Sequence, residues 1–345
     1  MMALTIARPD DWHLHLRDGA ALAGVVGHSA ERFARAVVMP NLSPPVTTVD
    51  QALAYRRRIL AALPEGSDFV PLMALYLTER TSPSEIARAA ADEHVVAVKL
   101  YPAGATTHAE AGVRDLRRCT PALEAMAEAG VPLLVHGESI DPDVDVFDRE
   151  RVFIERELVP LLERLPELKV VLEHVTTREG VELVRGAGPG VAATITPHHL
   201  LLDRNALFRG GLRPHHYCLP VLKREPHRLA LVEAATGGEA KFFLGTDSAP
   251  HPRRAKESAC GCAGIYTAHA ALELCAEVFE TAGALERLEG FASRHGAAFY
   301  ELPPNTATVR LTKEPWTVPA HYPLGDDVVV PLRAGETVAW RLAPP

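Results

Sequence analysis

The stretch Val95-Val96-Ala97-Val98-Lys99-Leu100-Tyr101 carries the strongest fold signal in the chain. Its apolar, largely β-branched residues occupy both alternating faces, which is typical of a strand buried on both sides of a parallel sheet. Lysine is almost never fully buried without a partner, and burial can lower its pKa by roughly 3–5 units. Three interpretations of Lys99 compete: a strand-end amine that reaches solvent, a Schiff-base nucleophile, or an amine modified so that it binds metal.

Similar apolar runs recur along the chain and alternate with helical patterns. The predicted strands are residues 2–6, 34–39, 69–75, 95–100, 131–135, 169–172, 191–195 and 241–244. The predicted helices between and after them are residues 50–63, 84–91, 121–129, 149–165, 225–235 and 263–279. Eight strand–helix units joined by right-handed crossovers predict an α/β fold, a closed (β/α)8 TIM barrel. The alternative, an open doubly wound sheet, normally has a glycine-rich turn after its first strand, where this chain has His13-Leu14-His15.

We expect residues 1–345 to form a single domain, with residues 303–345 as a C-terminal extension packed on the barrel. Short strand-like runs among prolines in this extension are too small to form an independent domain. The connection 103–114 is long and contains Gly104, Thr106, Thr107 and Gly112. Loops of this length in compact domains are often lids or binding loops, so this connection is a candidate lid.

Composition limits the classes of function. At 345 residues and 47% hydrophobic content the chain can bury a large core, and its formal net charge of -8 argues against a nucleic-acid partner. Residues 1–12 show no basic region followed by an apolar core, and no apolar run is long enough to cross a membrane. The five cysteines are an odd number with one close C-x-C pair, which fits reduced thiols. We therefore expect a cytoplasmic protein without a membrane partner.

Chemically active side chains follow the predicted strands. They are His13, His15, Lys99, His136, His174 and Asp247. The C-terminal ends of barrel strands meet at the active-site face, and neutral imidazoles together with a carboxylate suit zinc. Singly, each has an ordinary explanation: a chance H-x-H, a core histidine, or a helix cap. Jointly they favour a metal site. The pair His198-His199 also follows a strand, but neighbouring residues there would point to opposite faces, so we expect at most one to face the centre.

In these segments the chain resembles the amidohydrolase superfamily and, within it, the compact bacterial-type dihydroorotases. The matching segments are 13–19, 39–41, 99–107, 134–138, 172–174, 195–200 and 245–251. The resemblance implies two zinc ions bridged by Lys99 carboxylated on its ε-nitrogen. His13, His15 and Asp247 would hold the first ion with that carbamate, and His136 and His174 the second.

The resemblance also implies how a substrate would bind. The side chains that match the substrate carboxylate contacts are Arg17 and Asn41. Further contacts match Leu219 through its backbone, His251 and Ala263, and the lid threonines match Thr106 and Thr107. Leu219 lies in the segment that matches least closely.

The implied activity is the reversible cyclisation of N-carbamoyl-L-aspartate to L-dihydroorotate, a step of pyrimidine synthesis, by a homodimer. A hydroxide shared by the two ions would be the nucleophile, and Asp247 the general base and then acid. Another cyclic amidase, such as a hydantoinase or an allantoinase, is an alternative, although such relatives are usually longer and carry a β-sandwich. A Schiff-base aldolase using Lys99 is a second alternative, but it would not need the histidines at the barrel rim. A non-catalytic protein with the same fold is a third, but it should have lost metal ligands, and none is missing.

Overall fold

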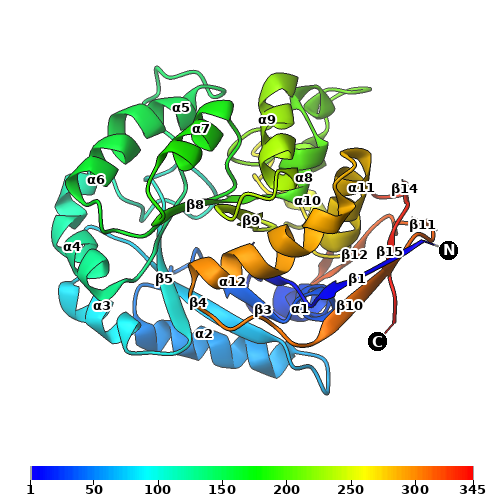
Figure 1. The fold of residues 1–345 in the computed structure, drawn as a ribbon, viewed down its shortest axis with the longest axis horizontal. Coiled ribbons are helices and arrows are strands. Elements are labelled where there is room, and N and C mark those ends of the chain that lie inside the picture. The colour runs from blue at the N-terminus through cyan, green and yellow to red at the C-terminus, as the bar shows by residue number, and fades with distance from the viewer. Residues whose placement is uncertain (1, 345) are drawn as a thin grey trace.

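The computed structural model describes residues 2–344, and eight of its strands form a parallel barrel (Figure 1). They are β2 (Asp10–Leu14), β3 (Arg35–Val38), β4 (Val70–Tyr76), β5 (Val95–Leu100), β6 (Leu133–Val135), β7 (Val170–Leu172), β8 (Val191–Ile195) and β9 (Phe242–Leu244). Neighbouring strands pair in sequence order from β2 to β9. The ring closes where Leu14 pairs with Ser248 and the Asp247 amide donates to the His13 carbonyl at 2.8 Å. The predicted (β/α)8 barrel is confirmed.

Helices surround the strands in both views. They are α1 (Ala20–Arg32), α2 (Val49–Ala62), α3 (Pro83–Ala90), α4 (Thr120–Ala129), α5 (Arg149–Phe153), α6 (Val159–Arg164), α7 (Arg178–Gly186), α8 (Pro197–Leu201), α9 (Glu225–Thr236), α10 (Arg253–Lys256), α11 (Ala271–Thr281) and α12 (His295–Phe299). A π-helical turn, Ile154–Leu158, joins α5 to α6. Local sequence sets the ends: Thr48 and Gln51 form a capping box on α2, and Gly130 ends α4 with φ 69°.

The strands separate two layers of apolar side chains. Alternate strand residues fill the barrel interior, and they include Val37, Leu72, Ala97, Leu134, Val171, Ala192 and Phe243. The remaining strand residues face outward and pack against the helices, as Val98 and Leu100 do. This explains why β5 is apolar on both faces: both are covered. In the described part of the chain, no helix is both long and apolar enough to cross a membrane.

Two element predictions are wrong. Residues 2–6 are not the first barrel strand, because β1 (Ala3–Ala7) pairs antiparallel with β10 (Thr308–Thr312) outside the barrel. The first barrel strand is β2, whose buried Asp10 forms an ion pair with Arg35 at 2.6 Å, so its sequence lacks the expected apolar run. The helix expected from residue 263 begins at Ala271, because Ile265 and Tyr266 form strand-like bridges to Ser248 and Pro331.

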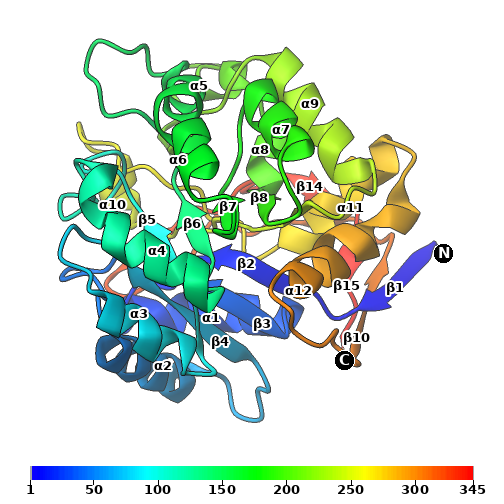
Figure 2. The same cartoon turned by 60° about the vertical axis from the view of Figure 1, so that its left-hand side comes forward.

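Residues 303–342 continue along one side of the barrel, where β10 lies between β1 and β15 (Figure 2). The short strands there are β11 (Trp316–Thr317), β12 (Tyr322–Leu324), β13 (Asp327–Val329), β14 (Thr337–Val338) and β15 (Arg341–Leu342). Leu311 and Trp340 are fully buried in the same apolar cluster as the outer faces of the barrel strands. This segment thus shares the barrel's core.

Candidate metal centre and substrate pocket

One pocket lies at the C-terminal ends of the barrel strands. All the site residues expected from the sequence line it except Lys99 and His251: His13, His15, Arg17, Asn41, Thr106, Thr107, His136, His174, Leu219, Asp247 and Ala263. They come from eight different parts of the barrel rim, so the fold alone brings them together.

His13, His15 and Asp247 present three electron-pair donors to a common point. His13 Nδ1 lies 2.6 Å from a Glu173 carboxylate oxygen, and His15 Nδ1 lies 2.9 Å from the Asn41 side-chain oxygen. Both partners are acceptors, so each Nδ1 carries a proton, and the Nε2 lone pair is the one that such a ring can offer to a metal ion. Those two Nε2 atoms lie 3.5 and 3.0 Å from the same Asp247 oxygen. These three atoms are close enough to share a proton or a metal ion, and two imidazoles with a carboxylate are a donor set that suits a metal ion.

The charge states support metal binding. Burial lowers the pKa of His15 to about 4, so its ring is neutral at pH 7 and can coordinate. Burial alone would raise the pKa of Asp247, but the neighbouring rings of His15 and His13 hold that pKa well below its usual range. Asp247 is therefore an ionised carboxylate.

His136 and His174 extend the cluster. The ring centroid of His174 lies 5.0 Å from that of His13 and 4.8 Å from that of His136. His136 Nε2 lies 2.7 Å from a buried Glu138 oxygen and donates to it, which leaves Nδ1 as the free lone pair. Burial holds the pKa of His174 well below its ordinary value, so it too is neutral. These rings can serve as ligands to a second ion.

Lys99 lies beneath the histidines on β5 with no exposed surface. Its Nζ has no hydrogen-bond partner among residues 2–344 and sits 5.3 Å from the centre of the Tyr101 ring. Burial lowers the pKa of this amine to about 8, although Glu173 and Asp247 act to raise it. A buried amine without a partner is costly, which indicates that something else completes this site.

Three rim residues have left-handed backbone angles. Arg17, His174 and Asp247 have φ values of 58°, 40° and 44°. Such angles are uncommon outside glycine and carry a cost of about 1–3 kcal/mol each. The barrel therefore holds these side chains in orientations that an ordinary strand end would not give.

One wall of the pocket is suited to an anion. Arg17 Nε donates to the Pro250 carbonyl, and its Nη2 lies 2.9 Å from His251 Nε2. His251 Nε2 also lies 2.9 Å from the Ala263 carbonyl. His251 therefore contacts two residues that line the pocket, Arg17 and Ala263, without lining it itself. The remaining Arg17 N–H groups make no hydrogen bond to the described residues, so they are open to a carboxylate.

The connection 103–114 contains no helix or strand, as expected, and its residues Thr106 and Thr107 line the pocket. Thr107 Oγ1 donates to the Ala263 carbonyl at 3.3 Å, and Asn41 Nδ2 donates to the Thr107 carbonyl at 3.1 Å. His108 Nδ1 lies 3.2 Å from the Asn41 carbonyl. Asn41 therefore contacts both His15 and the loop.

The sequence analysis did not identify the partners that orient the candidate ligands. Glu173 holds His13, and Thr194 donates to the same Glu173 oxygen at 2.6 Å. Glu138 and Glu173 each stand within two residues of a predicted histidine, which is a usable signal. Lys256 Nζ donates to the carbonyls of Tyr217, Cys262 and Gly264 at 2.7–2.8 Å, and nothing in its local sequence indicates this.

His198 and His199 do not line the pocket, so the expectation that at most one faces the centre holds, but the reason given for it is wrong. They lie on the helical turn α8 rather than on an extended strand, so their side chains do not point to opposite faces. Their ring centroids are 4.4 Å apart, and both rings are buried next to Cys218.

Comparison with known proteins places this geometry in context. The model of the amidohydrolase family matches residues 6–322. A dihydroorotase from Laribacter hongkongensis is 66% identical over 344 residues, which cover 99% of the chain and 100% of the relative. The crystal structure of dihydroorotase from Campylobacter jejuni has a TM-score of 0.91 at 36% identity, covering 99% of this chain and 98% of that one. The Saccharomyces cerevisiae dihydroorotase in complex with 5-fluoroorotic acid has a TM-score of 0.91 at 34% identity, with both chains fully covered.

Proposed function

The chain belongs to the amidohydrolase family, among its dihydroorotases, and we propose that its pocket interconverts N-carbamoyl-L-aspartate and L-dihydroorotate. The activity is that of a metal-dependent hydrolase with a small-molecule substrate. One observation carries the assignment of the pocket: the His13 and His15 lone pairs converge on the Asp247 carboxylate in the pocket that Arg17 also lines.

We propose that His13, His15 and Asp247 hold one zinc ion, that His136 and His174 hold a second, and that carboxylated Lys99 bridges them. The proton positions on three of these rings fit this role, because each turns a lone pair away from its carboxylate or amide partner. Such ions polarise an amide carbonyl and lower the pKa of coordinated water when bound.

Lys99 fits carboxylation. An amine adds to carbon dioxide only in its neutral form, and burial favours that form by lowering the pKa to about 8. The ammonium first loses one proton to give the neutral amine, and forming the N–C bond with carbon dioxide releases a second, so a cationic side chain becomes an anionic carbamate. The unpartnered amine would then become a group with two oxygen ligands.

The other residues bind and orient the substrate. The free N–H groups of Arg17 and the amide of Asn41 would hold its carboxylate, with His251 supporting Arg17. Leu219 and Ala263 line the pocket, and Thr106 and Thr107 would close over it. Asp247 is ionised, so it can take a proton from the attacking water and pass it to the departing ring nitrogen. In the reverse direction the same carboxylate returns the proton.

The proposal is tested by substrate choice and metal content on one sample. Initial rates with L-dihydroorotate, hydantoin and allantoin should favour L-dihydroorotate, with two zinc ions per chain. Preference for either other ring would support a different cyclic amidase. Lys99→Ala should lose both metal and activity, by more than the roughly 10–100-fold that removing an outer partner costs. An active Lys99→Ala protein with full metal would exclude the bridge, and Lys169→Ala on the surface is the control.

We also propose that the enzyme is a cytoplasmic homodimer. The odd number of cysteines, all free among the described residues, is consistent with a reducing compartment. Sedimentation analysis of the purified chain tests the dimer, and a monomer at micromolar concentration would contradict it.

A further inference from the structure

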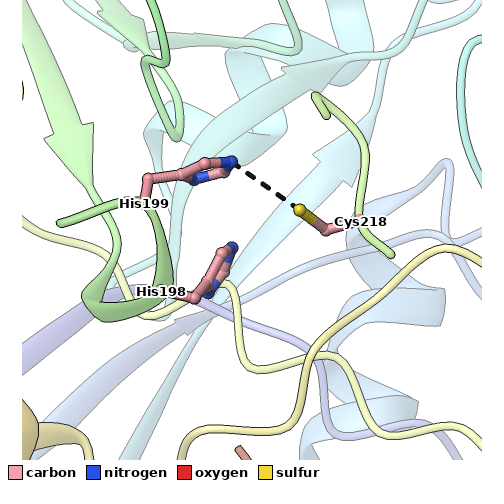
Figure 3. Close-up of side chains that lie close together, drawn as sticks. All are labelled: His198, His199 and Cys218. Atoms are coloured by element: carbon pink, nitrogen blue, oxygen red, sulfur yellow. Dashed lines mark hydrogen bonds between the residues drawn. The ribbon is translucent and has the colours of Figure 1, made fainter. Parts of the chain in front are cut away.

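A second cluster of metal-binding side chains lies outside the candidate metal centre (Figure 3). His198 and His199 come from α8, and Cys218 comes from the segment that leads to α9. One ligand atom of each lies within 4.8 Å of the other two. All three side chains are buried, with exposed fractions of 0%, 2% and 1%.

His198 is the unexplained member of this cluster. Both of its ring nitrogens are buried and have no hydrogen-bond partner in the part of the chain that the structure describes. At least one N–H of a neutral imidazole is therefore unpaired, at a cost of about 1–3 kcal/mol. Figure 3 shows the His198 ring next to the His199 ring, with Cys218 beside them.

The atoms around His199 have the spacing of a coordination shell. His199 Nε2 lies 3.7 Å from Cys218 Sγ and 3.1 Å from the Pro220 carbonyl oxygen, and Sγ lies 3.3 Å from that oxygen. A tetrahedral zinc ion with N, O and S ligands separates them by about 3.3–3.6 Å. The three atoms thus form one triangular face of such a site with little movement.

The proton on His199 can move to allow coordination. Its Nδ1 lies 2.9 Å from Thr196 Oγ1, a hydroxyl that can donate or accept. With the proton on Nδ1, the hydroxyl accepts it and Nε2 is free for metal. With the proton on Nε2, the ring donates to the Pro220 carbonyl instead.

We propose that His198, His199 and Cys218 bind one zinc-type divalent ion, with the Pro220 carbonyl or a water as fourth ligand. Cys218 would bind as thiolate and release its proton to solvent. Two imidazoles and one thiolate are a donor set typical of zinc. Leu219 lies between Cys218 and Pro220 and lines the substrate pocket, so the ion would fix that stretch of backbone.

Cobalt substitution of the full-length protein tests the site directly. The proposed catalytic ligands are nitrogen and oxygen atoms, so only a thiolate ligand gives a sulfur-to-cobalt charge-transfer band in the near ultraviolet. We expect this band in the wild type and its loss in Cys218→Ser and in His198→Gln. Each variant should hold one metal equivalent fewer than the wild type by mass spectrometry. Cys260→Ser, which changes an exposed cysteine, is the matched control and should keep both the charge-transfer band and the wild-type metal content.

The outcomes separate the site from a hydrogen-bonded core. A wild-type protein without the band, or equal metal content in wild type and Cys218→Ser, would overturn the proposal. A band that survives Cys218→Ser and disappears in Cys260→Ser would place the thiolate elsewhere and also overturn it. If Cys218→Ser fails to fold, the wild-type spectrum and His198→Gln still decide. The inference is independent of the proposed function, because it is measured by metal and spectrum rather than by turnover.

Discussion

At the scale of single residues, the site depends on where protons lie. His13, His15 and His136 each give one N–H to a fixed acceptor, so the free lone pair of each ring is determined before any ion arrives. His136 and His174 could be predicted from the sequence because they follow apolar strands, and His13 and His15 because they form an H-x-H pair. Their acceptors could not be assigned, because contacts such as His13 with Glu173 join residues far apart in the chain. Lys256 illustrates the same limit: its three carbonyl partners are fixed only by the folded loops.

The buried amine of Lys99 predicts a pH-dependent stability in metal-stripped, bicarbonate-free protein. Burial lowers its pKa from 10.5 to about 8. Between these two pH values the unfolded chain binds more protons than the native one, so the free energy of unfolding rises with pH. Below pH 8 the native protein bears the full cost of burying the charged Lys99 amine. Lys99→Met should therefore be more stable than the wild type by about 3 kcal/mol at pH 7.

Urea unfolding at several pH values measures this difference. The gap between Lys99→Met and wild type should narrow as pH rises from 8 to 10.5. A gap that stays constant across this window would show that burial does not lower the pKa of Lys99. The surface variant Lys169→Met should show no such trend.

Lys256 predicts an effect on substrate binding. It fixes the carbonyls on either side of Ala263 and the carbonyl of Tyr217, two residues before Leu219. Losing charged hydrogen bonds worth about 1.5–3 kcal/mol should raise KM roughly tenfold or more in Lys256→Met, with a smaller change in kcat. Steady-state kinetics at constant metal content measure this.

Lys241→Met is a matched control for Lys256. Lys241 also donates to two carbonyls, those of Val184 and Ala187, but it precedes β9 at the opposite end of the barrel. Equal kinetic losses in both variants would mean that Lys256 acts only through general stability.

At the scale of elements, strands and helices with a regular apolar pattern could be predicted from the sequence. Elements whose residues are set by contacts with a neighbouring strand could not. Most barrel strands were located within two residues, since an apolar β-rich run requires no knowledge of its partner. The first strand was misplaced because β2 buries Asp10 against Arg35, a contact with the next strand. The extended backbone expected at His198 and His199 was wrong because α8 begins directly after β8, at Pro197 with Thr196 as its cap.

The loop 103–114 predicts a turnover defect without metal loss. Thr107→Val keeps the side-chain shape but removes the hydrogen bond to the Ala263 carbonyl, worth about 1 kcal/mol. If that bond forms as the loop closes, kcat/KM should fall about fivefold while zinc content is unchanged. Thr281→Val on the surface of α11 is the control, and wild-type kinetics in Thr107→Val would argue against a lid role.

At the scale of the whole molecule, the C-terminal segment completes the core. Composition and strand count predicted one barrel with an extension, but not that β10 would pair with β1 or that Trp340 would be fully buried. Those contacts join the two ends of the sequence, and no local pattern encodes them.

Removing residues 304–345 should therefore prevent stable folding. The truncated chain would lose the partner of β1 and expose the core that Leu311 and Trp340 cover. Circular dichroism and thermal unfolding should show no cooperative transition, and Trp340→Ala should fold but lose about 3–5 kcal/mol. A truncated chain that unfolds cooperatively would make the extension dispensable. Removal of residues 344–345 is the control.

The closure of the barrel between β2 and the segment after β9 also sets the order of events during synthesis. His13 and His15 leave the ribosome early, whereas Asp247 follows only after seven further strands have been made. Until then the two histidines lack Asp247, the third ligand of the ion that we propose they bind, and the barrel is open where Leu14 later pairs with Ser248. The proposed metal centre can therefore be completed only when the barrel is almost fully synthesised. Binding of the ion would then stabilise the contact between β2 and the segment after β9 that closes the barrel.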